Sequence, residues 1–293
     1  MKKVSVIIPN LNGLSLLKIC LPSLLKQSFR NIEIILVDNG STDNSVKFVI
    51  GKFPGVKIIK LSKNLGFSRA VNKGIKISKG NLIFLLNNDT EIEKDCIKYL
   101  VKAAEKADVG FVQAKILNFY DRDKIDSLGD EIDIVGHLYS TGFGKMDGEG
   151  FKIGKYIFAG SGGGTLFKNE VFEKVGLFDE DYFFYYEDID LSFRAQIAGF
   201  KGWLEPKAKI YHMRMGTSSR IKNSLEPIIF REMTETIIKN YPLKLIFKNL
   251  NFLRIMLVHL NTIRYLILKG YLLDVVKNEW YLISSLGKIL KKR

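Results

Sequence analysis

Carboxylate and amide side chains stand at three places where they could bind a ligand. Asp38 follows an apolar run, Asp89 ends the triplet Asn87-Asn88-Asp89, and Glu187 and Asp188 open a segment with helical apolar spacing. Such groups can accept a hydrogen bond from the imide nitrogen of a pyrimidine base, or hold a divalent cation that bridges two phosphates. They can also bind the hydroxyl groups of a carbohydrate. We therefore treat all three places as candidate functional sites.

Each of these places also has a purely structural interpretation. Asp38 and the residues after it are typical of a helix-capping turn, and the triplet 87–89 is typical of an Asx turn. Acidic residues such as Glu187 and Asp188 favour the positive end of a helix dipole. Residue type alone therefore leaves both interpretations open at each place.

Five consecutive aromatic residues, Tyr182 to Tyr186, come directly before Glu187. Because five neighbours cannot all face one core, we expect some of them to line a ligand cleft. Aromatic rings beside carboxylates suit a carbohydrate ligand. His212 is a further candidate, although a lone histidine is more often a structural residue than a metal ligand.

Apolar runs and helical patterns alternate in the first part of the chain. Short runs rich in β-branched residues predict strands, and capping residues followed by helical spacing predict the helices between them. Strands that are apolar on both faces indicate a parallel sheet with helices on each side, and such sheets bind ligands at the carboxyl ends of their strands. The expected strands are 4–9, 32–38, 56–62 and 81–87, and the expected helices are 15–28, 41–53 and 66–78.

The rest of the chain is less regular. Residues 115–165 are rich in Gly, Asp and aromatic residues, and their order is hard to predict. A helix is expected at 169–176, another from Asp188 to Gly199, and a strand at 201–212. The chain has neither a glycine-rich dinucleotide fingerprint after its first strand nor a Walker lysine loop, which argues against a Rossmann dehydrogenase and a P-loop ATPase.

The positive charge is concentrated near the C-terminus. The formal net charge is +14, and residues 241–293 hold ten Lys or Arg against two acidic residues. This suggests a local anionic partner, either a membrane surface or nucleic acid. The basic residues are interleaved with aliphatic ones and no nucleic-acid-binding motif is present, so we expect no nucleic acid as partner.

Other features point to a reducing compartment. Cys20 and Cys96 both stand in apolar settings without a CxxC spacing, so we predict buried free thiols.

The first residues predict a strand and no signal peptide. No stretch has the roughly 18 uncharged apolar residues that a spanning helix needs.

Taken together in order, these segments resemble family 2 glycosyltransferases, and among them the rhamnosyltransferase-like enzymes of cell-surface polysaccharide synthesis. The resemblance covers residues 4 to about 219. It rests on VSVIIPNLN, ILVDNGSTDNS, NLGFSRAVNKGI, LIFLLNNDTEI, VGLFDEDYFFYYEDIDLSFR and KIYHMRMGTSS.

The resemblance implies a GT-A fold, an α/β architecture with a mostly parallel central sheet flanked by helices. Residues 1–220 would form the catalytic domain, in which 1–112 bind the nucleotide sugar and 113–220 bind the acceptor. Residues 221–293 would form a basic amphipathic helical tail.

The resemblance also implies roles for individual residues. Asp38 would read the base, and Asp89 with His212 would bind a divalent cation, Mg²⁺ or Mn²⁺. Asn87 departs from the first Asp of the family's DxD motif, which weakens the predicted metal site. The other nucleotide-sugar-binding positions are Pro9, Asn12, Asn64, Gly66, Asn72 and Asn88.

Asp188 matches the family's catalytic base. It would take the proton of an acceptor hydroxyl, and the anomeric configuration would invert in a single displacement. Glu187 would hydrogen-bond the acceptor or the donor sugar. The donor is expected to be a dTDP- or UDP-linked sugar, with rhamnose as one candidate, and the acceptor a glycan or a lipid-linked hydroxyl.

The tail has two interpretations. Its helices could pack on the catalytic domain, or they could lie on an anionic membrane surface with basic groups toward the lipid headgroups. We expect a cytoplasmic enzyme, peripheral on the inner face of the membrane. The alternative for the whole chain is a catalytically degenerate transferase-like partner protein, which the missing first Asp of the metal motif would explain.

Overall fold

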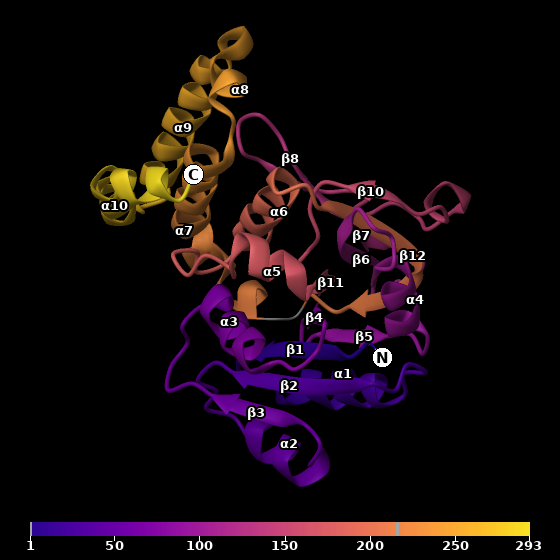
Figure 1. Cartoon of the computed structure of the whole chain (residues 1–293). Helices are drawn as coiled ribbons and strands as arrows, with labels where there is room; N and C mark the ends of the chain where they lie inside the picture. Colours follow the sequence, from indigo (N-terminus) through magenta and orange to yellow (C-terminus); the bar gives the residue numbers. More distant parts are fainter. Residues whose placement is uncertain (1, 215–216) are drawn as a thin grey trace.

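A mixed β-sheet organises the computed structural model, which describes residues 2–214 and 217–293, without side chains for 217–224 (Figure 1). Ten strands of the described residues join in this sheet, in the order β10-β12-β6-β11-β4-β1-β2-β3, while β5 pairs with β12 and β7 with β6. Met215 and Gly216, which belong to the last family motif, lie outside the described residues.

The predicted alternation of strands and helices is confirmed in the N-terminal half. Strands β1 to β4 run parallel to one another, with β1 between β2 and β4. The side chains of these strands are mostly apolar on both faces of the sheet, so helices can cover both sides. The strands are β1 (Val4–Asn10), β2 (Ile32–Asp38), β3 (Lys57–Lys60) and β4 (Leu82–Leu86), and the helices between them are α1 (Leu14–Leu25), α2 (Ser45–Lys52) and α3 (Phe67–Ile77).

The two faces of the sheet carry separate hydrophobic cores. Helices α1, α2 and α4 (Cys96–Ala103) pack on one face, with Val6 and Ile8 of β1 beneath them. Helices α3, α5 (Asn169–Val175) and α6 (Glu187–Ile197) pack on the other, over Ile7. Both cysteines are buried and free, as predicted, and burial raises the pKa of the Cys20 thiol to about 12.

The sheet becomes mixed in its second half. Strand β11 (Gly164–Lys168) lies antiparallel between β4 and β6 (Val109–Asn118), and β12 (Lys201–His212) runs parallel to β6. The segment that resisted prediction folds into short strands around a 3₁₀ turn. The remaining strands are β5 (Thr90–Ile92), β7 (Ile125–Ser127), β8 (Asp130–Ile132), β9 (Leu138–Ser140) and β10 (Lys155–Ile157), and the turn is η1 (Glu149–Phe151).

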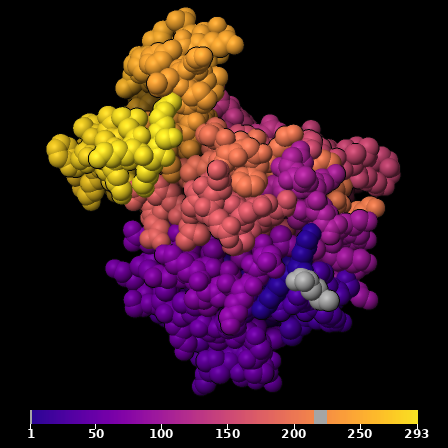
Figure 2. Space-filling model, in the orientation of Figure 1, coloured from indigo at the N-terminus to yellow at the C-terminus, as the bar shows by residue number. Residues whose placement is uncertain are grey.

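The C-terminal helices form an arm that extends from the sheet domain (Figure 2). Helix α7 contacts α6 and continues the body of the protein, while α9 and α10 lie further out. Among the described residues, none of the helices combines the length and the apolar character needed to cross a bilayer. The elements are α7 (Thr217–Asn240), α8 (Leu243–Phe247), η2 (Lys248–Leu250), α9 (Asn251–Leu268) and α10 (Leu272–Lys291).

A third hydrophobic core joins this arm to the rest of the chain. Tyr182 and Tyr186 of the aromatic run pack with Phe230 and Ile237 of α7 and with Leu266 of α9. The predicted boundary at residues 220 and 221 therefore falls within α7, a helix that shares a core with the segment before Glu187. For α7, the structure therefore favours the interpretation in which the predicted tail packs on the catalytic part.

Candidate active site

A cavity of about 450 Å³ opens at the carboxyl ends of β1 and β4. This is within the usual size range of small-molecule sites. Residues from segments far apart in the sequence line it. They are Pro9, Asn10, Leu11, Asn39, Asn64, Gly66, Phe67, Asn87, Asn88, Asp89, Ser161, Gly162, Gly163, Phe183, Phe184, Tyr185, Glu187, Asp188, His212, Arg214 and Leu225.

Two predicted nucleotide-binding residues hold the loops behind this cavity and do not line it. The buried carboxylate of Asp38 accepts hydrogen bonds from Asn10 Nδ2 and from the backbone N–H of Ser41, both at 3.2 Å. The side chain of Asn12 accepts hydrogen bonds from the backbone N–H groups of Thr42 and Asp43. The cavity wall above them is formed by Asn10 and Asn39, which the sequence analysis did not select.

The loop between β3 and α3 reaches the cavity as predicted. Asn64 Oδ1 accepts hydrogen bonds from Asn39 Nδ2 at 2.9 Å and from the Gly66 N–H at 3.0 Å. Gly66 has φ +87°, and a Cβ there would lie 2.6 Å from the carbonyl oxygen of Phe183. Only glycine suits this conformation and this close approach. The loop is therefore packed directly against the aromatic run.

Asn72 lies in α3 and is buried away from the cavity. Its side chain donates to the carbonyl of Phe178 at 2.8 Å and accepts from the N–H of the same residue at 3.1 Å. This paired contact ties α3 to the chain just before the aromatic run. The structure thus gives Asn72 a positioning contact, and no contact with the predicted ribose and diphosphate site.

The predicted metal ligands lie next to each other. Asp89 Oδ1 is 3.3 Å from His212 Nε2, although 122 positions separate the two residues. The pairing of β12 with β5 brings them together, because it places His212 opposite Thr90. Asn88 donates to Asn10 Oδ1 at 2.7 Å, and Asn87 packs against Gly163. The contact on which the metal prediction depends is therefore present.

His212 is oriented by a residue that the sequence analysis missed. Its Nδ1 lies 2.7 Å from Asp126 Oδ2, and Asp126 also pairs with Arg214. Burial alone would lower the pKa of His212, but its hydrogen bonds to Asp126 and Asp89 outweigh burial and raise the pKa to about 9. A carboxylate that fixes one ring nitrogen and leaves the other toward a cavity is typical of metal-binding histidines.

This donor set fits a divalent cation. An oxygen of Asp89 and Nε2 of His212 border the same cavity. Mg²⁺ and Mn²⁺ often need only one or two protein ligands, since phosphate and water oxygens complete their coordination. The chain can therefore hold such an ion without the Asp that Asn87 replaces.

Glu187 and Asp188 differ in their surroundings. Asp188 is held by the backbone, since its two oxygens accept hydrogen bonds from the N–H groups of Gly162 at 3.1 Å and Ile189 at 2.8 Å. Glu187 is 6% exposed, and its Oε2 has no hydrogen-bond partner among the described residues. Burial raises the pKa of both carboxyls, and for Glu187 the charge of Asp188 adds to this effect. An unpartnered buried oxygen at a cavity is suited to a ligand hydroxyl.

The aromatic run divides between core and cavity, as predicted. Tyr182 and Tyr186 are buried in the third hydrophobic core, whereas Phe183, Phe184 and Tyr185 line the cavity. The three cavity residues form what we call the aromatic wall. It lies between Gly66, which Phe183 contacts, and Glu187.

Some site residues had no usable signal in the sequence. Asp126 lies in the segment whose order could not be predicted, and only its contact with His212 shows its importance. The glycine-rich stretch before β11 lies in the same segment, and its backbone N–H at Gly162 donates a hydrogen bond to Asp188. That stretch could have been found, since a glycine-rich turn allows a close backbone approach.

The fold is of the GT-A type, with an α/β sheet that is flanked by helices and continuous with a second part that supplies Glu187 and Asp188 to the cavity. The sequence profile described as "Glycosyl transferase family 2" matches residues 5–176, more than half of the chain. The chain belongs to glycosyl transferase family 2.

Curated relatives carry related descriptions. The chain is 26% identical over 227 residues to the N-acetylglucosaminyl-diphospho-decaprenol L-rhamnosyltransferase of Mycobacterium tuberculosis, a match that covers 68% of this chain and 72% of that one. It is 33% identical over 126 residues to the glycosyltransferase GlyG of Streptococcus pneumoniae, covering 42% and 41% respectively. A match to an uncharacterized protein of Sinorhizobium fredii covers 71% of this chain but only 24% of that protein. The chain therefore spans less than half the length of some relatives that it matches.

Solved structures support the fold. A complex of GalNAc-T7 with UDP, GalNAc and Mn²⁺ superposes with a TM-score of 0.66 at 17% identity, over 82% of this chain and 48% of that one. The mannosyltransferase PcManGT of Pyrobaculum calidifontis, in complex with GDP-Man and Mn²⁺, gives 0.60 at 17% identity, over 98% and 75%. At this identity the likeness shows the fold alone.

Proposed function

We propose that this chain is an inverting glycosyltransferase that moves a sugar from a nucleoside diphosphate to a hydroxyl group, with Asp188 as catalytic base. The observation that carries the proposal is one cavity bordered by Asp188, Glu187 and the Asp89–His212 pair. The carboxylate of Asp188 can accept a proton there, and the Asp89–His212 pair can provide ligands for a cation that binds the diphosphate. Family membership supports glycosyl transfer, and the cavity supports this assignment of roles.

The reaction needs one base. Asp188 accepts the proton of the acceptor hydroxyl while the hydroxyl oxygen forms a bond to the anomeric carbon. The bond from that carbon to the diphosphate breaks, and the nucleoside diphosphate leaves with the electron pair. Two backbone N–H groups hold the carboxylate of Asp188 in place for this step. A second carboxylate acting as an acid is not needed, because a diphosphate is already a good leaving group.

Asp89 and His212 would hold a divalent cation beside the diphosphate, and Asp126 would keep the histidine ring oriented. When bound, the ion supplies positive charge that offsets the charge developing on the leaving diphosphate. Glu187, with its unpartnered Oε2, binds a hydroxyl of the acceptor or of the transferred sugar.

The donor is proposed to be a dTDP- or UDP-linked sugar, with rhamnose as one candidate, for which the named rhamnosyltransferase gives support. The acceptor is proposed to be a glycan or a lipid-linked hydroxyl in cell-surface polysaccharide synthesis.

The enzyme is proposed to lie on the inner face of the cytoplasmic membrane, because the exposed faces of α9 and α10 suit an anionic membrane surface. Trp280 and Ile283 of α10 are 70% and 68% exposed, in a segment, 241–293, with ten basic and two acidic residues.

A panel of nucleotide sugars with Mn²⁺ tests the proposal. We expect release of nucleoside diphosphate with at least one dTDP- or UDP-sugar, and Asp188→Asn to lower kcat by about 10²- to 10⁴-fold while nucleotide binding persists. Asp121→Asn, which only breaks a surface ion pair with Lys124, is the matched control and should leave kcat unchanged. Full turnover by Asp188→Asn would exclude this base. Absence of nucleotide binding by the wild-type chain would favour the degenerate partner protein.

A further inference from the structure

Helix α7 carries a row of polar side chains that are buried against the aromatic run. Glu232 and Thr236 are fully buried, Lys239 is 3% exposed and Asn240 is 7% exposed. Their spacing of four, three and one positions places them on one face of the helix. Charged side chains are rarely buried this deeply unless they are paired, so the row must have partners.

Glu232 binds the backbone of the aromatic wall. One of its carboxylate oxygens accepts a hydrogen bond from the N–H of Phe183 at 2.7 Å, and the other accepts from the N–H of Phe184 at 3.3 Å. The side chains of these two phenylalanines line the cavity. Burial raises the pKa of Glu232 to about 8, although these two hydrogen bonds and the neighbouring Arg231 oppose the effect. Two hydrogen bonds accepted by one carboxyl group fix both the position and the orientation of the chain.

The rest of the row holds the chain on both sides of the wall. Thr236 Oγ1 lies 2.9 Å from the hydroxyl of Tyr182. Lys239 Nζ pairs with Asp179 at 2.8 Å, before the wall, and with Asp190 of α6 at 2.6 Å, after it. Asn240 also donates to Asp190. Helix α7 therefore contacts the chain before the wall, the wall itself and the helix after it.

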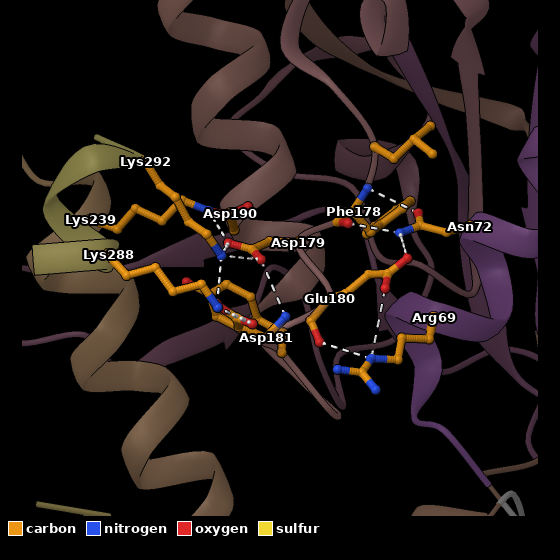
Figure 3. Close-up of polar contacts among 12 residues, drawn as sticks. Arg69, Asn72, Phe178, Asp179, Glu180, Asp181, Asp190, Lys239, Lys288 and Lys292 are labelled. Carbon is orange, nitrogen blue, oxygen red and sulfur yellow. Dashed lines mark hydrogen bonds and ion pairs between the residues drawn. The ribbon is translucent and has the colours of Figure 1, made fainter. Parts of the chain in front are cut away.

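The chain just before the wall is a junction between distant elements (Figure 3). Lys292, just past the end of α10, donates to Asp179 and Asp181, both at 2.7 Å, and Lys288 pairs with Asp181 at 2.6 Å. On its other side, Glu180 accepts from Asn72 of α3. Lysines thus hold Asp179 and Asp181, while Glu180 is held by side chains of α3.

The backbone of the wall needs such support. Tyr185 and Tyr186 have φ of +72° and +61°, a left-handed conformation that aromatic residues rarely adopt. Two such residues in succession persist only where the surrounding structure holds them. They directly precede Glu187, so their conformation sets where α6 begins and where Glu187 and Asp188 point.

We propose that Glu232 is a positioning residue for the transfer reaction, which holds the aromatic wall in the shape that the sugar-binding part of the cavity requires. This inference rests on the proposed function and adds α7 to the site. It assigns a role in the reaction to a helix that lies beyond the family match, which ends at residue 176. Leu225 of the same helix also lines the cavity.

Limited chymotrypsin digestion tests the support of the wall without any substrate. In Glu232→Ala we expect cleavage after Phe183, Phe184 or Tyr185 to be at least about tenfold faster than in the wild type, because two hydrogen bonds to the backbone of the wall are lost. Cleavage after the exposed Phe247 serves as internal reference. Glu226→Gln is the matched control, since this carboxylate lies on α7 but pairs with Lys269 of the arm.

Steady-state kinetics test the role in the reaction. With the donor found in the nucleotide-sugar panel, Glu232→Gln should change the donor KM or the ratio of hydrolysis to transfer by about fivefold or more, at an unchanged melting temperature. Glu232→Ala should show a larger effect, because the glutamine keeps one accepting oxygen. A merely structural role would lower only the amount of active enzyme.

The two failures are distinguishable. If the wild type turns over no nucleotide sugar, the proposed function fails, and the digestion still decides whether Glu232 holds the wall. If the wild type is active but Glu232→Ala shows unchanged cleavage, KM and hydrolysis ratio, the positioning role of Glu232 is overturned.

Discussion

His212 shows how the surroundings of a single side chain decide its chemistry. In the sequence it is a lone histidine, for which a structural role is the more frequent one and only the family resemblance favours metal binding. In the structure Asp126 binds one ring nitrogen, and Asp89 lies 3.3 Å from the other. This arrangement selects one orientation of the ring and directs the second nitrogen at a cavity-lining carboxylate.

Removing the support of His212 should weaken metal binding. We expect Asp126→Asn to lower the affinity for Mn²⁺, measured calorimetrically in the presence of UDP, by about 10- to 100-fold. Asp121→Asn should have no effect. Unchanged Mn²⁺ affinity in Asp126→Asn would mean that Asp126 does not act through His212.

The element that most changes the interpretation of the chain is α7. The sequence analysis assigned residues from 221 onward to a tail, yet α7 contributes Leu225 to the cavity and binds the aromatic wall through Glu232. It also joins the segment before the wall to α6. Its buried face is polar where it meets this segment, so hydrophobic patterning alone did not mark it as part of the site.

The ion pairs between α7, α10 and Asp179 should give the fold a measurable acid sensitivity. Burial alone would raise the pKa of Asp179, but Lys239 and Lys292 outweigh burial and lower it to about 2. A carboxyl with a lowered pKa stabilises the fold above its unfolded pKa near 4, and this contribution disappears as the pH falls from about 4 to 2. The shift corresponds to about 2 kcal/mol.

Urea unfolding of Asp179→Asn checks this. At pH 7 we expect the variant to lose about 2 kcal/mol of unfolding free energy, because Lys239 and Lys292 each lose one of their two carboxylate partners. At pH 3 the difference from the wild type should be smaller. A difference that stays constant between the two pH values would contradict the assigned ion pairs.

On the scale of the whole molecule, the arm presents an apolar surface that the rest of the chain does not cover. Leu273, Val276, Trp280, Ile283 and Leu290 of α10 are exposed at helical spacing. An exposed stripe of this kind indicates an interaction surface. The ten basic and two acidic residues of 241–293 favour an anionic membrane as its partner.

Vesicle binding tests this surface. We expect sedimentation with phosphatidylglycerol vesicles to fall at least about tenfold when Trp280 and Ile283 are both changed to Glu, since apolar area and charge complementarity are lost together. Ile197→Glu, at an equally exposed position of α6, is the control. Equal binding by the double variant would exclude this surface as the membrane contact, and loss of a dimer in solution would identify the surface as a contact between copies of the chain.

Much of the N-terminal half was predictable because its signals are local. The apolar runs of β1 to β4 and the helical patterns between them depend only on neighbouring residues, and a parallel sheet collects its strand ends at one edge. The place of Asp89 at a strand end followed in this way, whereas the role predicted for Asp188 came from the family resemblance.

The sequence alone thus determined the family, the sheet of β1 to β4 and the main carboxylates. Only the tertiary structure decided that Asp38 lies behind Asn10, that Asp126 orients His212, and that Glu232 holds the aromatic wall. Each of these contacts joins side chains that are 28 to 86 positions apart, or a side chain to the backbone 49 positions away. Strand register and helix packing create them, and neither leaves a periodic signal in the residues concerned.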